Sequence, residues 1–210
     1  MARTQAQVTE KVRRVWDKQA PRFDKSMAFW ERRLFRGDRE WACAQAEGDV
    51  LEFAVGTGRN FRHYPAGVRL TGFDLSPEMV ARARATASEL GLDAHLTVAD
   101  ATELGYADAS FDTILCTYSL CSIPDAPAAV RQMHRLLRPG GRAILAEHVR
   151  SPNPVVRALE ALGNLVISPF MCDDFLGEPD RYLREAGFEV GYSQRRKAGF
   201  VHRLVATKPA

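Results

Sequence analysis

The pattern of apolar and polar positions divides the chain into an N-terminal helical part and a longer part in which strands alternate with helices. Near the N-terminus, apolar residues recur at helical spacing with charges between them, at Val8, Val12, Val15 and Trp16. This spacing predicts an amphipathic helix over about 5–19, which is expected to end before Pro21. A second helix is expected over about 28–46, before a glycine at position 48.

Beyond residue 48, short apolar runs alternate with helical stretches, which predicts parallel strands joined by helical crossovers. The expected strands cover 49–53, 69–73, 94–98, 113–116, 142–148, 188–193 and 201–207. The expected helices cover 59–64, 77–90, 126–137, 155–166 and 179–186. An apolar stretch at 168–175 is expected to pack over another part of the chain or to line a pocket. We therefore predict a single α/β domain.

Glycines and acids follow the ends of three of these strands. Gly56 and Gly58 come after the first strand, where glycine lets a ligand approach the backbone closely. Asp74 ends the second strand, where a carboxylate is suited to accept ribose hydroxyls. Asp100 follows the third strand and is suited to accept from an adenine amine. Each acid alone is equally typical of a solvated loop, but the three features in order predict a nucleoside-binding site.

A nicotinamide-dependent enzyme is the first alternative, because its fingerprint also pairs a glycine turn with an acid on the next strand. The third glycine of that fingerprint would fall at Phe61. A phenylalanine ring is too large for the close packing of helix on strand that glycine permits. The sequence therefore disfavours a dinucleotide.

The composition is typical of a globular protein with one sizeable core. The 210 residues are 46% hydrophobic and 26% charged, and 29 basic against 26 acidic residues give a net charge of +3. Because no dense basic run is present, no nucleic-acid partner is predicted. The cysteines show no CxxC pair or metal-ligand spacing, so we expect no metal site and reduced thiols in the cytoplasm. No apolar run approaches membrane-spanning length.

Taken together, these segments resemble the class I S-adenosylmethionine-dependent methyltransferases from about residue 48 to the C-terminus. The resemblance rests on five motifs in order, at 52–58, 73–79, 99–101, 111–117 and 136–141. It implies a Rossmann-like seven-stranded mixed sheet with helices on both faces. It also implies S-adenosyl-L-methionine as the cofactor and S-adenosyl-L-homocysteine as the product.

By this resemblance, the first motif holds the methionine part of the cofactor through Glu52, Ala54, Gly56, Thr57 and Gly58. Asp74 would hold the ribose, and Asp100 with Ala101 the adenine edge. Leu75 and Met79 would enclose the adenine ring, although Met79 fits an ordinary helix core equally well.

Three further positions lie near the expected cofactor site. Thr117 is expected beside the reactive methyl, because it follows the fourth strand. Ala54 stands where the family often has its first glycine, and we expect an ordinary backbone conformation there. The segment 16–24 resembles the lid of quinone-type methyltransferases, with Phe23 where tyrosine is frequent. Phe23 is therefore expected to cover the cofactor without a hydroxyl contact.

Methyl transfer requires mainly alignment of the acceptor and exclusion of water, and a base helps when the nucleophile must lose a proton. His148 is the candidate base, because it ends the fifth strand at the edge where parallel sheets place their ligands. A purely structural histidine is the alternative, and His63 is a weaker candidate. The segments 116–125 and 147–149 resemble a subgroup that includes phospholipid-amine and thiol methyltransferases. The acceptor atom stays open among oxygen, nitrogen, sulfur and carbon.

We expect residues 1–47 to form a helical lid, and 48–210 to form the cofactor-binding domain with a lid insertion at 150–177. A small, partly apolar acceptor is predicted from the apolar residues of these lids, Trp16, Phe23, Phe29, Trp30, Phe170, Met171 and Phe175. A minor hydrophobic core is the alternative role for them.

The N-terminal helix is compatible with two roles. It either covers the cofactor or rests weakly on an anionic membrane surface through Arg13, Arg14, Arg32 and Arg33. The membrane role would suit an alternative function, a membrane-surface phospholipid N-methyltransferase. A second and separate alternative is a non-catalytic cofactor-binding module used for interaction.

Overall fold

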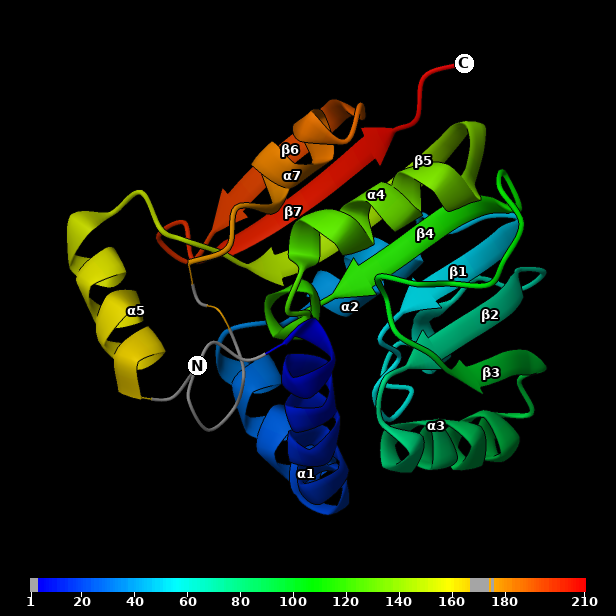
Figure 1. Cartoon of the computed structure of the whole chain (residues 1–210), viewed down its shortest axis with the longest axis horizontal. Coiled ribbons are helices and arrows are strands. Elements are labelled where there is room, and N and C mark those ends of the chain that lie inside the picture. The colour runs from blue at the N-terminus through cyan, green and yellow to red at the C-terminus, as the bar shows by residue number, and fades with distance from the viewer. Residues whose placement is uncertain (1–3, 167–173, 175) are drawn as a thin grey trace.

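A mixed seven-stranded sheet forms the centre of the molecule in the computed structural model, which describes residues 4–166, 174 and 176–210 (Figure 1). The strand order is β3-β2-β1-β4-β5-β7-β6. The strands are β1 (Asp49–Phe53), β2 (Arg69–Asp74), β3 (Ala94–Val98), β4 (Phe111–Thr117), β5 (Leu137–His148), β6 (Glu189–Arg196) and β7 (Val201–Thr207). Strands β1 to β5 are parallel, and β7 pairs antiparallel with β5 and β6. The predicted seven-stranded mixed sheet is thereby confirmed.

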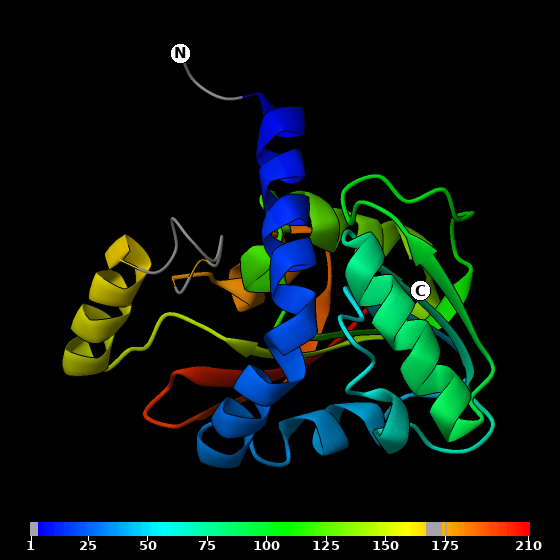
Figure 2. The ribbon, with the colours of Figure 1, turned by 90° about the horizontal axis from the view of Figure 1, so that it is seen from below.

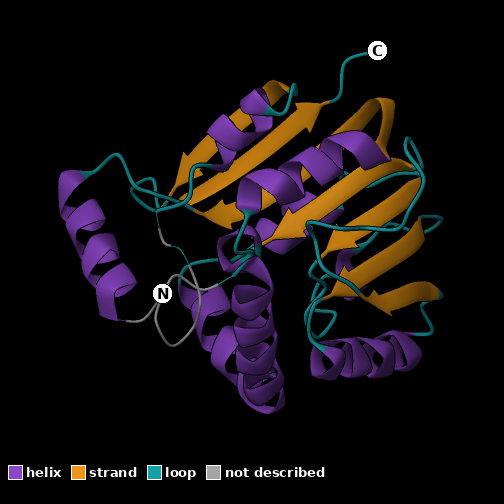
Figure 3. Cartoon of the chain, in the orientation of Figure 1, coloured by secondary structure: helices purple, strands orange, loops and turns teal. Residues whose placement is uncertain are grey.

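Helices cover both faces of this sheet (Figure 3). They are α1 (Gln5–Arg33), α2 (Asp38–Cys43), α3 (Pro77–Leu90), α4 (Ala126–Leu136), α5 (Pro154–Val166) and α7 (Pro179–Glu185), with short 3-10 turns η1 (Phe61–His63) and η2 (Leu120–Ser122). Along β5, Leu145 packs in the core under α4 and α7, whereas its neighbours Ile144 and Ala146 pack in a cluster with α2. This alternation is why the strand is apolar on both sides.

The N-terminal helices differ from the prediction. Helix α1 passes through Pro21 without interruption and ends at Arg33, so the predicted helix end before Pro21 is wrong. Beyond a short connection, α2 covers only Asp38–Cys43 of the predicted 28–46 helix. Ala20 is buried beside the exposed proline. Contacts of α1 with the rest of the chain on either side of Pro21 therefore hold the helix together where proline alone would end it.

Two other predicted elements change length. The helix expected at 59–64 is reduced to the single 3-10 turn η1. Strand β5 starts at Leu137 instead of 142, because Leu137 pairs with Phe111 across a register shift in β4. Of the apolar stretch at 168–175, only Asp174 lies within the described residues.

Helix α1 lies across the carboxyl ends of the parallel strands, and α5 stands apart beside it (Figures 1 and 2). Among the helices that the structure describes, none is both long and apolar enough to cross a membrane.

Candidate active site

A cavity of about 420 Å³, here called the first cavity, lies between α1 and the carboxyl ends of the parallel strands. Most of the residues predicted to bind the cofactor line it, namely Ala54, Gly56, Asp74, Leu75, Met79, Asp100, Ala101 and Thr117. The candidate base His148 also lines it. The remaining predicted residues, Glu52, Thr57 and Gly58, are buried next to this lining.

The turn after β1 is built on backbone conformations that favour glycine. Gly56 and Gly58 have φ values of +55° and +82°. At Gly58, a Cβ atom would lie 2.5 Å from the ring of Phe61, so the phenylalanine fills the space that a side chain would need. Phe61 thus packs against the turn from η1.

The backbone conformation of Ala54 differs from the expected one. Its φ of +49° lies in the left-handed region, so the ordinary backbone conformation expected there is wrong. A residue with a Cβ atom is strained in this region by about 1–2 kcal/mol relative to the usual conformations. The chain therefore accepts strain at a residue that lines the first cavity.

Asp74 joins the glycine turn to the loop after β2. One carboxylate oxygen accepts a hydrogen bond from the backbone N–H of Gly56 at 2.9 Å, and the other accepts from that of Ser76 at 2.9 Å. Burial raises the pKa of Asp74 to about 6, against the lowering effect of these two bonds. Each oxygen keeps a second lone pair, so the side chain can still accept hydroxyl groups from a ligand.

Asp100 follows β3, the strand next to β2, which ends at Asp74. Its carboxylate accepts from the backbone N–H and the hydroxyl of Thr102, at 2.9 Å and 2.7 Å. It is half-buried and lines the first cavity. Asp74 and Asp100 therefore provide hydrogen-bond acceptors toward one end of the cavity.

Glu52 is fully enclosed and reaches the first cavity only through its neighbour Asn60. Its two oxygens accept from Asn60 Nδ2 at 2.9 Å and from the Tyr64 hydroxyl at 2.8 Å. Burial raises the pKa of Glu52 to about 7. Asn60 also donates to Thr117 Oγ1 at 2.9 Å. Glu52 thereby orients the side-chain amide of Asn60, which in turn orients Thr117 of the cavity lining.

Arg39 is a lining residue that the sequence analysis missed. From α2 its guanidinium donates to Thr117 Oγ1 at 2.6 Å and to Asn60 Oδ1 at 3.0 Å, and its Nε pairs with Glu31 at 2.6 Å. Arg59 also lines the cavity and pairs with Glu31 of α1. Nothing in the local sequence distinguishes Arg39 from the other basic residues, because its role comes from the packing of α2 on the sheet.

The lid over the first cavity is α1. Its Trp16, Phe23 and Trp30 line the cavity, and the rings of Trp16 and Phe23 meet edge to face at 6.0 Å. Trp30 is also 46% exposed, and Phe29, which is 48% exposed, does not line the cavity. Phe170, Met171 and Phe175 lie outside the described residues.

Three carboxylates fasten α1 to the turns below it. Asp17 accepts from the Ser76 hydroxyl at 2.6 Å, and Asp24 accepts from the Thr57 hydroxyl at 2.7 Å. Glu31 pairs with Arg39 and Arg59. Thr57 therefore contacts the lid and not the interior of the first cavity.

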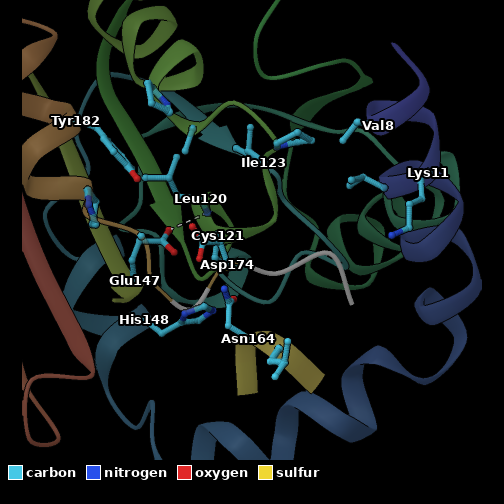
Figure 4. Close-up of a pocket in the computed structure, with 17 residues that line it drawn as sticks. Val8, Lys11, Leu120, Cys121, Ile123, Glu147, His148, Asn164, Asp174 and Tyr182 are labelled. Atoms are coloured by element: carbon cyan, nitrogen blue, oxygen red, sulfur yellow. Dashed lines mark hydrogen bonds between the residues drawn. The ribbon is translucent and has the colours of Figure 1, made fainter. Parts of the chain in front are cut away.

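A second cavity, of about 490 Å³, lies between α1, η2, α5 and α7 (Figure 4). Figure 4 shows Glu147, His148, Asn164 and Asp174 together at one end, with Val8 and Lys11 of α1 at the other. The two cavities share part of their lining, Val12, Cys121, Ile123, Pro124 and His148. They therefore adjoin, and His148 lies at their junction.

His148 is held by packing and is neutral near pH 7. Its ring stacks on Phe200 with 5.7 Å between centroids and 7° between planes. Burial lowers its pKa to about 4, although the charge of Asp174 acts in the opposite direction. A neutral imidazole has one nitrogen able to accept a proton, so this position suits a weak base.

Glu147 precedes His148 in the sequence and is fully buried. Its carboxylate accepts from the backbone N–H groups of Ser119 and Leu120 and from the Cys116 thiol. Burial raises its pKa to about 7.

Sequence comparisons find methyltransferases. A family model described as a methyltransferase domain matches residues 51–145. A phosphatidylethanolamine N-methyltransferase of Cereibacter sphaeroides is 37% identical over 118 residues, 55% of this chain and 58% of the relative. A thiol S-methyltransferase of Homo sapiens is 33% identical over 60% of this chain and 53% of the relative. The chain therefore spans little more than half the length of these two relatives.

A third relative is matched over most of its length. It is a ubiquinone/menaquinone biosynthesis C-methyltransferase of Bdellovibrio bacteriovorus, 32% identical over 82% of this chain and 77% of the relative. Among solved structures, an S-adenosylmethionine-dependent methyltransferase of Thermotoga maritima superposes with a TM-score of 0.69 over 93% of this chain and 99% of that one. Its sequence is 20% identical, so this likeness concerns the fold.

Proposed function

The chain belongs to the class I S-adenosylmethionine-dependent methyltransferases, and from this premise we propose that the first cavity holds the cofactor and the second cavity holds the methyl acceptor. The observation that carries the proposal is the junction of the two cavities at His148. Thr117, expected beside the reactive methyl, pairs with Ala146 of β5, the strand that ends at His148. The acceptor is small and partly apolar, as the mixed lining of the second cavity suggests.

The residues of the first cavity fit the chemistry of the cofactor. Asp74 offers acceptors for ribose hydroxyls, and Asp100 offers one for the adenine amine. Arg39 and Arg59 place guanidinium donors on the lining for a carboxylate, beside the ion pairs that both make with Glu31, a contact that the sequence analysis did not assign. Leu75 and Met79 supply apolar contact for the adenine ring.

When bound, the cofactor supplies a methyl group already activated by a positive sulfur. The residues of the first cavity would hold this cofactor, and its methyl group would pass to a nucleophilic atom of an acceptor held in the second cavity. The protein holds the acceptor in line and excludes water through Trp16 and Phe23 of α1. Where the acceptor carries a proton, the neutral imidazole of His148 receives it.

Calorimetry with S-adenosylmethionine and S-adenosylhomocysteine tests the cofactor assignment. Asp74→Ala is expected to weaken binding by about 1–3 kcal/mol through lost charge-assisted hydrogen bonds. Asp93→Ala, at an exposed acid on a loop, is the control and should bind as the wild type does. Unchanged affinity in Asp74→Ala would refute the ribose contact.

A screen of thiols, phenols, amines and lipids for S-adenosylhomocysteine release tests transfer and identifies the acceptor class. His148→Gln is expected to slow transfer to thiols or phenols, which must lose a proton, and to spare tertiary amines, which have none to lose. Equal losses on both kinds of acceptor would make His148 a packing residue. Cofactor binding without transfer to any acceptor would favour the non-catalytic module.

A further inference from the structure

Helix α5 is oriented with its polar side toward the protein and its apolar side toward solvent. Glu160 is buried, and its carboxylate accepts from the backbone N–H of Ser151 at 2.9 Å. The outward side carries four large apolar side chains with exposed fractions of 57% to 75%, Val155, Leu159, Leu162 and Leu165. A surface helix normally turns such a stripe toward the core. The exposed apolar side of α5 therefore indicates a partner that is itself apolar.

Helix α1 has a basic outer face. Exposed residues recur at helical spacing along one side of it, Arg14, Lys18, Arg22, Lys25, Phe29 and Arg32. Its four acids occur at every seventh position, Glu10, Asp17, Asp24 and Glu31, and each is engaged in an ion pair. Arg13, expected from the sequence on a membrane-facing side, instead pairs with Glu10 and Asp17.

The charge on this outer face is largely uncompensated. Within the described chain, the ion pairs of the structure involve none of Lys18, Arg22, Lys25 or Arg32. The side of α1 that faces away from the sheet therefore attracts anions.

The two helices that carry these faces line one cavity. The second cavity is lined from α1 by Val8, Lys11 and Val12, and from α5 by Asn164 and Leu165. Helix α1 lies along the carboxyl-end edge of the sheet, and α5 stands apart from the sheet on the same side as α1 (Figures 1 and 2). Leu165 is 75% exposed and also lines the cavity, so the apolar exterior of α5 is continuous with the cavity lining.

We propose that α1 and α5 together form a docking surface for an anionic phospholipid bilayer. The apolar side of α5 lies among the acyl chains at the interface, and the basic face of α1 contacts lipid phosphates. A second copy of the chain would bring two basic faces together, which is unfavourable. A nucleic acid would leave the leucines of α5 uncovered. The proposal concerns a surface and does not depend on the proposed catalytic function.

The test is flotation of the full chain with phosphatidylcholine vesicles, with and without one quarter phosphatidylglycerol. Binding is expected to the anionic vesicles and to weaken with added salt. Lys18→Gln with Arg22→Gln is expected to reduce partitioning roughly tenfold to thirtyfold, since each basic residue near the surface adds to the attraction. Leu159→Gln with Leu162→Gln is expected to reduce it roughly tenfold or more.

Two matched double variants serve as controls. Arg62→Gln with Arg131→Gln removes the same charge at exposed sites on other elements. Leu90→Gln with Val98→Gln changes apolar side chains that are 46% and 48% exposed elsewhere. Both should bind vesicles as the wild type does.

Several outcomes would overturn the proposal. They are failure of the wild type to float with anionic vesicles, and equal losses in the control and test variants. If the wild type proved to be a dimer, and the α5 variant lost the dimer but kept lipid binding, the apolar side of α5 would be assigned to contact with a second copy. Calorimetric cofactor binding, measured in parallel, reports on the proposed function separately.

Discussion

At the scale of single residues, Ala54 carries backbone strain that a substitution can release. Its φ of +49° is costly with a Cβ atom and free of that cost for glycine. We expect Ala54→Gly to raise the free energy of unfolding by about 0.5–1 kcal/mol, after the larger entropy of an unfolded glycine is subtracted. Urea denaturation of both proteins measures this change in the free energy of unfolding. Ala85→Gly, at an exposed position within α3, should instead destabilise by about 1 kcal/mol.

Glu147 is expected to make stability depend on pH. Burial raises its folded-state pKa from 4.5 to about 7, so the folded protein holds this proton more tightly than the unfolded chain. The stabilising effect of the protonated carboxyl is present below pH 4.5 and is lost as pH rises to about 7. This loss is on the order of 3 kcal/mol.

Glu147→Gln has no proton to lose, so its stability relative to the wild type should increase between pH 5 and pH 8. Urea unfolding at both pH values measures the difference. A constant difference between the two proteins would mean that Glu147 has an ordinary pKa in the folded state.

The sequence located those site residues whose position follows from a strand end. Asp74, Asp100 and Thr117 line the first cavity because parallel strands end at one edge of the sheet. Arg39 could not be found in this way, because it reaches the cavity only by the packing of α2 on β4 and β5. Ala54 stands at the position of the family's first glycine and has a positive φ. The sequence could not predict this conformation, because alanine ordinarily avoids positive φ values.

At the scale of elements, the parallel strands were predicted well because continuous apolar runs report burial on both faces. Strands β1 and β3 have the predicted bounds. The edge strand β6 was shifted, since most of its side chains are exposed and give no such signal. Helix α1 was predicted too short, because Pro21 is a local signal and the contacts that overrule it come from distant residues.

Pro21 leaves a local weakness in α1. It is exposed, lacks the backbone N–H of the helical ladder and clashes with the preceding turn. Pro21→Ala is expected to stabilise the helix by about 1–2 kcal/mol. Hydrogen exchange should then show slower exchange across α1. Lys25→Ala, an exposed change one turn later, is the control, and equal slowing in both variants would contradict the argument.

At the scale of the whole molecule, Asp38 joins the N-terminal helices to the C-terminal hairpin. It is fully buried, pairs with Arg196 of β6 and Arg203 of β7, and accepts from the Tyr118 hydroxyl at 2.6 Å. The predicted division between a lid at 1–47 and a domain at 48–210 stays a proposal. The Asp38 contacts suggest that α2 folds as part of the domain.

Asp38→Asn should therefore destabilise the entire chain. It leaves two arginines facing a neutral amide in a buried place, which is expected to cost about 3–5 kcal/mol. Thermal unfolding measures the loss, and Asp93→Asn at an exposed loop position should show none. A loss below about 1 kcal/mol would mean that water or other groups compensate the arginines.

The fastening of α1 by Asp17, Asp24 and Glu31 has a consequence for turnover. A molecule enclosed beneath the helix leaves only after some of these contacts open. We expect release of the demethylated cofactor to be slower than methyl transfer. The first turnover of each enzyme molecule should therefore be faster than the later turnovers. Rapid mixing would record this as an initial burst of product equal to the amount of enzyme.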